Sequence, residues 1–259
     1  MALVRCDFFS DVLELNASMT VVLPQATSAQ IGVRGTARSE GHPTLYLLHG
    51  LSDDDTIWTR FTSIERYVAP LGLAVVMPQV HRSFYSDELN GHRYWTFLSE
   101  ELPEVVSSFF RVSNRREDTF VAGLSMGGYG AFKWALRQPH RFAAAASLSG
   151  ALDLVSVRRT RAPRAVDAHL FDRVFGNRLE GTDDDLLWLL GKADVPSLPR
   201  MYLGCGTEDH LYPHNVTFRD ACLARGVPLT VDFGPGDHDW GYWDARISDV
   251  LAWLPLDAP

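Results

Sequence analysis

Short, nearly continuous apolar runs recur along this chain and alternate with segments in which apolar residues have helical spacing. Such runs are typical of strands buried on both faces of a parallel sheet, and they lie at 44–48, 73–77, 120–124, 142–148, 199–204 and 228–233. Helical segments are predicted at 61–68, 95–110, 126–138, 215–225 and 240–254, where Pro103 is discordant and indicates either a kink or a helix start. The alternation predicts an α/β protein with a mostly parallel central sheet and helices on both faces.

Two regions depart from this rhythm. At the N-terminus, apolar and polar positions alternate in the runs 4–8, 12–15 and 19–23, with turn residues at 16–18, which predicts antiparallel strands at one edge of the sheet. Residues 151–197 form a cap-like insertion within one domain over 1–259, and we expect it to roof the pocket. We interpret its basic run as a solvated face, with contact to an anionic substrate as the alternative; the run consists of Arg158, Arg159, Arg161 and Arg164.

Composition places the chain among globular proteins with a large core. Of its 259 residues, 46% are hydrophobic and 22% are charged, which fits one α/β domain. The net charge of −8 argues against a nucleic-acid or anionic-membrane partner, and no window reaches the roughly 18 apolar residues that a membrane span needs. The three cysteines are widely spaced and the N-terminus lacks the pattern of a secretory signal, so a cytoplasmic location is expected. The oligomeric state is left open, a homo-oligomer included.

The run 120–124 leads into Gly123-Leu124-Ser125-Met126-Gly127, a Gly-x-Ser-x-Gly pattern that continues as a helix. A serine at this position lies on a sharp turn between strand and helix, with its hydroxyl held clear of the sheet. Because the residues two before and two after it face each other closely, Gly123 and Gly127 must be small. The strand before the motif and the helix after it make Ser125 the candidate nucleophile, in preference to an ordinary turn serine.

A serine hydroxyl needs a base within hydrogen-bond reach, and the base needs a carboxylate to orient it. In this architecture the acid and then the histidine follow the serine along the chain, each just past the carboxyl end of a strand. Asp209 follows the run 199–204 and His238 follows 228–233, so both are predicted to form a triad with Ser125. Glu208 is the alternative acid. The other histidines, including His210 beside the acid, are interpreted as surface or packing residues.

Two backbone N–H groups must stabilise the oxyanion that develops on the reacting carbonyl. Met126 N–H, next to the candidate nucleophile, is predicted to supply the first. The second is expected from the loop after the run 44–48, where Gly50 permits the backbone angle that turns Leu51 N–H inward. His49 in the same loop is interpreted as a brace for the loop and not as a base.

Aromatic residues near these motifs are candidates for the wall of an acyl pocket. Since aromatic side chains near the centre of a fold belong to the core more often than to a pocket, a core role is favoured for each. The four candidates are Trp58, Tyr85, Trp95 and Tyr129. The acidic run 53–55 lacks the ligand spacing of a Ca²⁺ loop and is interpreted as helix-capping or solvent-facing, so no metal site is expected there.

These motifs together resemble the esterase D-related group of α/β-hydrolases, with closest similarity to bacterial tributyrin esterases and a more distant one to S-formylglutathione hydrolases and mycolyltransferases. The matching stretches span most of the chain, at 47–51, 82–87, 101–103, 123–128, 206–209 and 236–240. The loop 83–87 and the pair Asp239-Trp240 are similar to the tributyrin branch. Ser52-Asp53 stands where the glutathione hydrolases carry a Cys-Thr pair, which argues against specificity for glutathione thioesters. The resemblance implies an α/β-hydrolase fold and hydrolysis of short acyl esters without a cofactor.

The sequence therefore predicts a serine carboxylesterase that acts on a small-molecule ester through an acyl-enzyme intermediate. Two alternatives are a thioesterase of the S-formylglutathione hydrolase type and a non-catalytic binding protein on a hydrolase scaffold, since a fold does not fix a function. A binding protein of that kind usually lacks one member of the triad, and this sequence contains all three.

Overall fold

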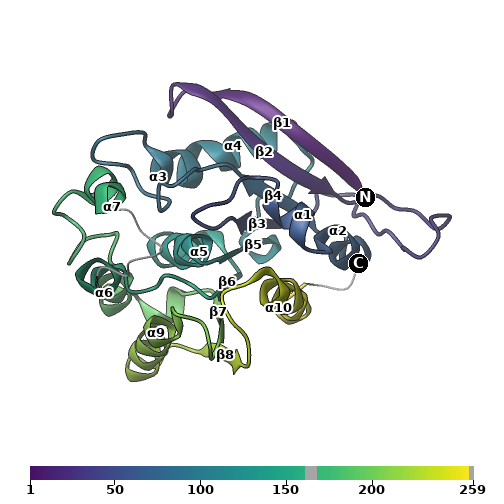
Figure 1. Ribbon diagram of the computed structural model, residues 1–259. Coiled ribbons are helices and arrows are strands. Elements are labelled where there is room, and N and C mark those ends of the chain that lie inside the picture. The colour runs from purple at the N-terminus through teal and green to yellow at the C-terminus, as the bar shows by residue number, and fades with distance from the viewer. Residues whose placement is uncertain (161–167, 257–259) are drawn as a thin grey trace.

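The described residues fold around one eight-stranded sheet with the strand order β1-β2-β4-β3-β5-β6-β7-β8 (Figure 1). The structure, a computed structural model, describes residues 1–160 and 168–256. Strands β1 and β2 pair antiparallel with each other, β2 pairs antiparallel with β4, and the six strands from β3 to β8 are parallel. The prediction of a mostly parallel sheet with antiparallel N-terminal strands is confirmed. The strands are β1 Ala2–Ser10, β2 Leu15–Leu23, β3 Thr44–Leu48, β4 Ala74–Pro78, β5 Thr119–Leu124, β6 Ala144–Leu148, β7 Arg200–Gly206 and β8 Leu229–Gly234.

The two faces of the sheet carry separate apolar cores, because successive side chains of a strand point to opposite faces. Leu45 and Leu47 of β3 join one core, which is completed by α1 Ile57–Phe61, α2 Ile64–Val68 and α10 Trp240–Trp253. Tyr46 and Leu48 join the other core, together with residues of α3 Tyr94–Thr96, α4 Leu102–Phe109, α5 Met126–Arg137, α6 Leu154–Thr160, α7 Ala168–Phe175, α8 Leu186–Lys192 and α9 Tyr212–Ala224. In Figure 1, α2 and α10 lie to the right of the sheet and α5 and α9 to its left. Helices therefore cover both faces, as predicted.

The insertion between β6 and β7 packs on the same core as the sheet. Apolar side chains of α6, α7 and α8, such as Leu154 and Phe171, join the core on the α5 face. Of the predicted basic run, Arg158 pairs with Asp172 at 3.1 Å and Arg159 pairs with Glu180 at 2.7 Å. The other two members, Arg161 and Arg164, lie outside the described residues.

The N-terminal hairpin differs from the expectation at its turn. Residues 16–18, which were expected to form a turn, continue strand β2, and the chain reverses instead at 11–14, where Glu14 has a φ of +57°. The turn is stabilised by Glu101, whose carboxylate accepts the N–H of Asp11 at 2.7 Å. Leu13, which the alternation placed in a strand, is 2% exposed because the turn directs it into the core.

The predicted helix 95–110 contains a π-helical turn, Phe97–Glu101, between α3 and α4. Pro103 lies in the first turn of α4, where its ring would meet the carbonyl of Ser99 in a regular helix. The wider turn relieves that clash, so the discordant proline marks a helix start. Further 3₁₀ turns lie at Ala69–Leu71, Arg116–Asp118, Pro139–Arg141 and Val195–Ser197. Among the described residues, no helix combines the length and the apolar composition that crossing a membrane requires.

Candidate active site

Ser125 lies on a strained turn between β5 and α5. Its φ of 53° and ψ of −114° are unusual for a residue other than glycine. A Cβ atom on Gly123 would lie 2.4 Å from the carbonyl carbon of Gly127, and one on Gly127 would lie 2.3 Å from the carbonyl oxygen of Leu48. The two glycines are therefore required by the close approach of three backbone segments, as the sequence motif predicted. The turn is held by a hydrogen bond of 2.9 Å from Ser125 N–H to Leu148 C=O.

The three side chains predicted to act together form one hydrogen-bonded chain. Nε2 of His238 lies 3.1 Å from Oγ of Ser125, and Nδ1 of His238 lies 2.8 Å from Oδ2 of Asp209. Asp209 Oδ1 also accepts the N–H of Leu211 at 2.7 Å, which fixes the carboxylate. The Asp209 side chain is fully buried and that of His238 is 20% exposed, so the chain leads from the protein interior to the cavity.

Glu208, the alternative acid, faces another partner. Its side chain is exposed and accepts the N–H of Gly236 at 2.6 Å, in the loop that carries His238. The loops after β7 and β8 are thereby tied together. The hydrogen bond from Gly236 lowers the pKa of the Glu208 carboxyl, which stays ionised.

The surroundings of the His238–Asp209 pair keep Asp209 in its charged form. Burial opposes ionisation of this carboxyl, but the hydrogen bond and the charge of His238 outweigh it, and the pKa of Asp209 is lowered. The ring of His238 stands edge-on to Trp243, with centroids 4.8 Å apart, and to His210 at 4.6 Å. Burial and the neighbouring His238 lower the pKa of His210, which favours its neutral form.

The loop after β3 is held by side chains on both sides. Nε2 of His49 accepts the N–H of Val80 at 3.2 Å, so the proton lies on Nδ1, which donates to the carbonyl of Gly50 at 2.7 Å. Burial lowers the pKa of His49 to about 4 and keeps the ring neutral. Because C=O and N–H of one trans peptide point in opposite directions, fixing the Gly50 carbonyl also fixes the Leu51 N–H. His49 is thus a brace for the loop, as its position in the motif indicated.

A cavity of about 920 Å³ opens over Ser125. Leu51 and Met126, whose N–H groups were predicted to bind an oxyanion, both line it. Apolar walls come from α6, through Leu154 and Val157, and from Phe84. Polar lining residues that the sequence analysis did not single out as pocket residues are Ser52, Asp53, Arg82, His210, His214 and Asp239. His214 lies in α9, and the others lie in the loops that follow β3, β4, β7 and β8. Only their closeness to a motif in the sequence could have indicated them.

The four aromatic residues considered for a pocket wall are not among the residues that line this cavity. All are buried, as the favoured core role requires, and three donate hydrogen bonds to backbone carbonyls: Trp58 to Leu48 at 3.1 Å, Tyr85 to His49 at 2.8 Å and Tyr129 to Asp184 at 2.8 Å. Trp95 lies under the guanidinium of Arg137, 4.0 Å from its ring centre. These aromatics therefore belong to the core and not to the wall of this cavity.

The acidic run 53–55 has three different roles. Asp53 accepts the N–H of Gly50 at 3.1 Å, and burial raises the pKa of its carboxyl. Asp54 accepts the N–H of Thr56, the N-cap residue of α1, at 2.8 Å, but no described side chain caps the first turn of this helix, so Asp54 holds the preceding turn and is not the helix cap. Asp55 is 3% exposed and accepts the hydroxyl of Thr20, so the solvent-facing interpretation is wrong for this residue.

One group of described side chains has ligand atoms close enough to hold a metal ion. These are Asp209, His210 and His238, whose ligand atoms lie within 4.8 Å of one another. Two of the three are joined by the hydrogen bond of the Ser125 chain, so an ion would compete with that bond.

Comparison with known proteins gives consistent matches over almost the whole chain. A family model described as putative esterase matches residues 12–254. An acetyl esterase of Caldicellulosiruptor saccharolyticus is 30% identical over 262 residues, with 98% of both chains covered. The substrate-bound structure of fluorophosphonate-binding serine hydrolase F of Staphylococcus aureus superposes with a TM-score of 0.88 at 35% identity, with 99% of both chains covered. An S-formylglutathione hydrolase of the same organism gives a TM-score of 0.84 at 35% identity over 98% of both.

A mostly parallel sheet between two helical layers, with a serine, a histidine and an aspartate joined at the carboxyl ends of its strands, defines the α/β-hydrolase class. Within that class the chain belongs to the esterase family, which confirms the resemblance of its motifs to the esterase D-related group. It is an enzyme, a serine hydrolase that acts on carboxylic ester bonds.

Proposed function

We propose that this protein hydrolyses short-chain acyl esters through an acyl-enzyme intermediate, with Ser125 as nucleophile, His238 as general base and acid, and Asp209 as the group that orients the imidazole. The observation that carries the proposal is the continuous hydrogen-bonded chain from Ser125 Oγ through His238 to Asp209, at 3.1 and 2.8 Å. Oxygen and nitrogen atoms at these distances can transfer a proton directly.

The chemistry follows from this chain. His238 Nε2 removes the proton of Ser125 while Oγ attacks the ester carbonyl, and the imidazolium is stabilised by the buried Asp209 carboxylate. The N–H groups of Leu51 and Met126 bind the oxyanion of the tetrahedral intermediate, a contribution of about 3 kcal/mol for each donor. His238 then returns the proton to the leaving alcohol. A water molecule repeats the sequence on the acyl-enzyme, so no metal or organic cofactor takes part.

The preference for short acyl groups is supported by the relatives and by the motifs, while the cavity supplies apolar contacts for the acyl group. Leu154 and Val157 of α6 and Phe84 line its apolar side. A named relative of 30% identity is an acetyl esterase. The tributyrin-like motifs in the loop 83–87 and after His238 agree with a small acyl group.

A thioesterase of the S-formylglutathione hydrolase type is the second candidate, because a hydrolase of that name from Staphylococcus aureus is 35% identical. Against it stands the pair Ser52-Asp53, which lines the cavity and follows Leu51 where the glutathione hydrolases carry a Cys-Thr pair. The carboxyl group of Asp53 is poorly suited to receive the carboxylates of glutathione.

We also propose that the chain forms one domain and works in a reducing compartment such as the cytoplasm. Both apolar cores pack on the single sheet. The cysteines Cys6, Cys205 and Cys222 are free thiols, which fits such a compartment.

The test is hydrolysis of p-nitrophenyl esters by wild type and Ser125→Ala. We expect Ser125→Ala to lose activity by a factor of at least about 10³ while it unfolds at an unchanged temperature. Ser108→Ala, which removes an exposed hydroxyl on α4, is the matched control. Retention of most activity by Ser125→Ala would refute the assignment. A panel of p-nitrophenyl esters from acetate to octanoate, assayed beside an acyl-glutathione of equal acyl length, separates the esterase hypothesis from the thioesterase hypothesis.

A further inference from the structure

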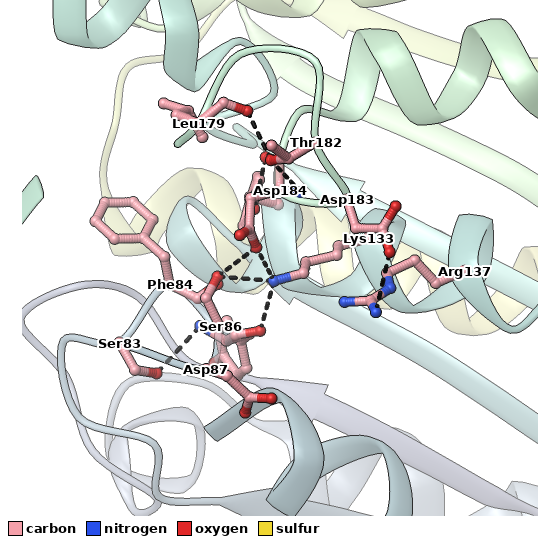
Figure 2. A network of polar contacts seen from close by, with 12 residues as sticks. Ser83, Phe84, Ser86, Asp87, Lys133, Arg137, Leu179, Thr182, Asp183 and Asp184 are labelled. Carbon is pink, nitrogen blue, oxygen red and sulfur yellow. Dashed lines mark hydrogen bonds and ion pairs between the residues drawn. The ribbon is translucent and has the colours of Figure 1, made fainter. Parts of the chain in front are cut away.

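Lys133 of α5 is a fully buried ammonium group on the helix that begins at Ser125. Its side chain is 0% exposed, and its Nζ donates to Asp184 Oδ1, to Ser86 Oγ at 2.7 Å and to Tyr85 C=O at 2.9 Å (Figure 2). An ammonium has three donors, so each is satisfied. The group also lies over the ring of Trp95, at 5.1 Å from its centre. Nothing in the proposed reaction uses this charge directly.

The partners of Lys133 come from two other parts of the chain. Asp184 belongs to the insertion, while Tyr85 and Ser86 belong to the loop 83–86 that precedes α3. Ser86 Oγ also donates to Asp184 at 2.8 Å, which closes a ring of contacts. Burial lowers the pKa of Lys133 and opposes ionisation of Asp184, but the Lys133 ammonium outweighs burial at Asp184 and lowers the pKa of this carboxyl. The contact between the two groups is an ion pair. Figure 2 shows Asp184 and Ser86 converging on the Lys133 ammonium.

The loop 83–86 is held in a conformation that needs such an anchor. Phe84 and Tyr85 have φ values of 51° and 52°, in the left-handed region that residues with a Cβ rarely adopt in succession. Strained backbone persists only where surrounding contacts determine it. The bond from Lys133 to the Tyr85 carbonyl is one such contact, and the bond from Tyr85 N–H to Ser83 Oγ at 3.1 Å is another.

Tyr85 connects the loop 83–86 to the loop that precedes Leu51. Its ring packs directly on α5, since a Cβ on Gly130 would lie 2.5 Å from Tyr85 Cδ2. Its hydroxyl donates to the carbonyl of His49 at 2.8 Å. The N–H of the same peptide, at Gly50, donates to Asp53 at 3.1 Å, so this peptide is held at both ends. The next peptide contains Leu51 N–H, and its orientation depends on the one before it.

We propose that Lys133 and Tyr85 are positioning residues for the oxyanion loop 49–51: Lys133, neutralised by Asp184, anchors the strained loop 83–86, and Tyr85 in turn sets the peptide that precedes Leu51 N–H. The inference rests on the proposed function, because the oxyanion site is part of it. This arrangement links the insertion to the reaction centre, since a displacement of Asp184 would reach the peptide before Leu51 through three hydrogen bonds and one aromatic ring.

The decisive variant is Tyr85→Phe, which removes one hydroxyl and keeps the ring on Gly130. We expect kcat for p-nitrophenyl acetate to fall about tenfold with KM within about twofold of wild type, since a misplaced oxyanion donor acts on the transition state. Affinity for a trifluoromethyl ketone, which forms an oxyanion on Ser125, should fall by the same factor. The matched control is Tyr67→Phe, which removes a hydroxyl donated to Asp244 at 3.1 Å. Neither residue lines the cavity, so this control should leave kcat unchanged.

The role of Lys133 is tested in the paired variant Lys133→Met/Asp184→Asn, which avoids leaving one buried charge alone. We expect kcat to fall without a matching change in KM, and addition of Tyr85→Phe to lower kcat by much less than in wild type, because both changes act on one path. Full kcat in folded Tyr85→Phe overturns the inference, as does a triple variant in which the two effects multiply. Activity retained by Ser125→Ala would instead overturn the proposed function, so the two failures are distinguishable.

Discussion

Gly127→Ala tests whether the serine turn and the oxyanion loop must approach as closely as they do. A Cβ atom at residue 127 would lie 2.3 Å from the carbonyl oxygen of Leu48 and 2.8 Å from that of His49. A carbon atom beside a carbonyl oxygen needs about 3.3 Å, so helix α5 and the loop 49–51 must separate by about 1 Å. Both obstacles are backbone atoms, and no change of rotamer can remove them.

A separation of this size withdraws one donor from the oxyanion. Donors in such a site act at about 2.7–3.1 Å, and a donor moved by about 1 Å no longer forms a hydrogen bond. Loss of one donor costs about 3 kcal/mol in the transition state, or about 10²-fold in kcat. We expect KM to change little, because the ester carbonyl in the ground state carries little charge.

The assay measures kcat and KM for p-nitrophenyl acetate, with thermal unfolding of each variant as the check on folding. Gly191→Ala is the matched control: it lies in α8 and a Cβ there has no heavy atom within 4 Å. We expect this control to keep kcat and to gain slight stability, since alanine favours helix over glycine by about 1 kcal/mol. A folded Gly127→Ala enzyme with kcat near the wild-type value would refute the steric argument.

Two further predictions concern groups around the site. Asp209→Asn should lower kcat by about 10³–10⁴ at pH 7 without loss of folding. The reason is that a neutral amide neither fixes the tautomer of the imidazole nor stabilises the imidazolium. A fall of less than tenfold would exclude Asp209 as the orienting acid. His49 has a folded-state pKa of about 4 against 6.5 for a free side chain. The unfolded chain therefore binds the proton first, and a stability contribution of about 3 kcal/mol, complete above pH 6.5, is lost as the pH falls toward 4. Urea unfolding at pH 7 and 4.5 should show this loss in wild type and not in His49→Asn; equal pH dependence in both would contradict it.

The strand-end rule explains why the candidate triad could be predicted from the sequence. Carboxyl ends of parallel strands meet at one edge of the sheet, so residues just past three apolar runs must be neighbours wherever they stand in the chain. Ser125, Asp209 and His238 needed only that rule and the chemistry of their side chains. The choice between Glu208 and Asp209 was settled by direction, since adjacent side chains diverge and only one can face the histidine.

Tertiary contacts decide what the sequence pattern could not. Lys133 resembles an ordinary exposed lysine on a helix, and only the arrival of Asp184 from the insertion makes its burial possible. The turn at 11–14 depends on Glu101, about 90 residues away in the chain, so no local signal places it. Whether the aromatic candidates lie in the core or in the cavity wall depends on hydrogen bonds to backbone carbonyls of other segments, and a local motif contains no signal for these bonds.

Strand β8 has a single neighbour in the sheet, β7, and its side chains are largely half-exposed or exposed. Fluctuations that open a protein locally begin at such margins and need far less free energy than global unfolding. The imidazole of His238 is attached to this margin, while Ser125 is attached to the interior strand β5. Local opening of β8 would therefore move His238 away from Ser125, and we expect activity under heat or denaturant to be lost before the centre of the molecule unfolds.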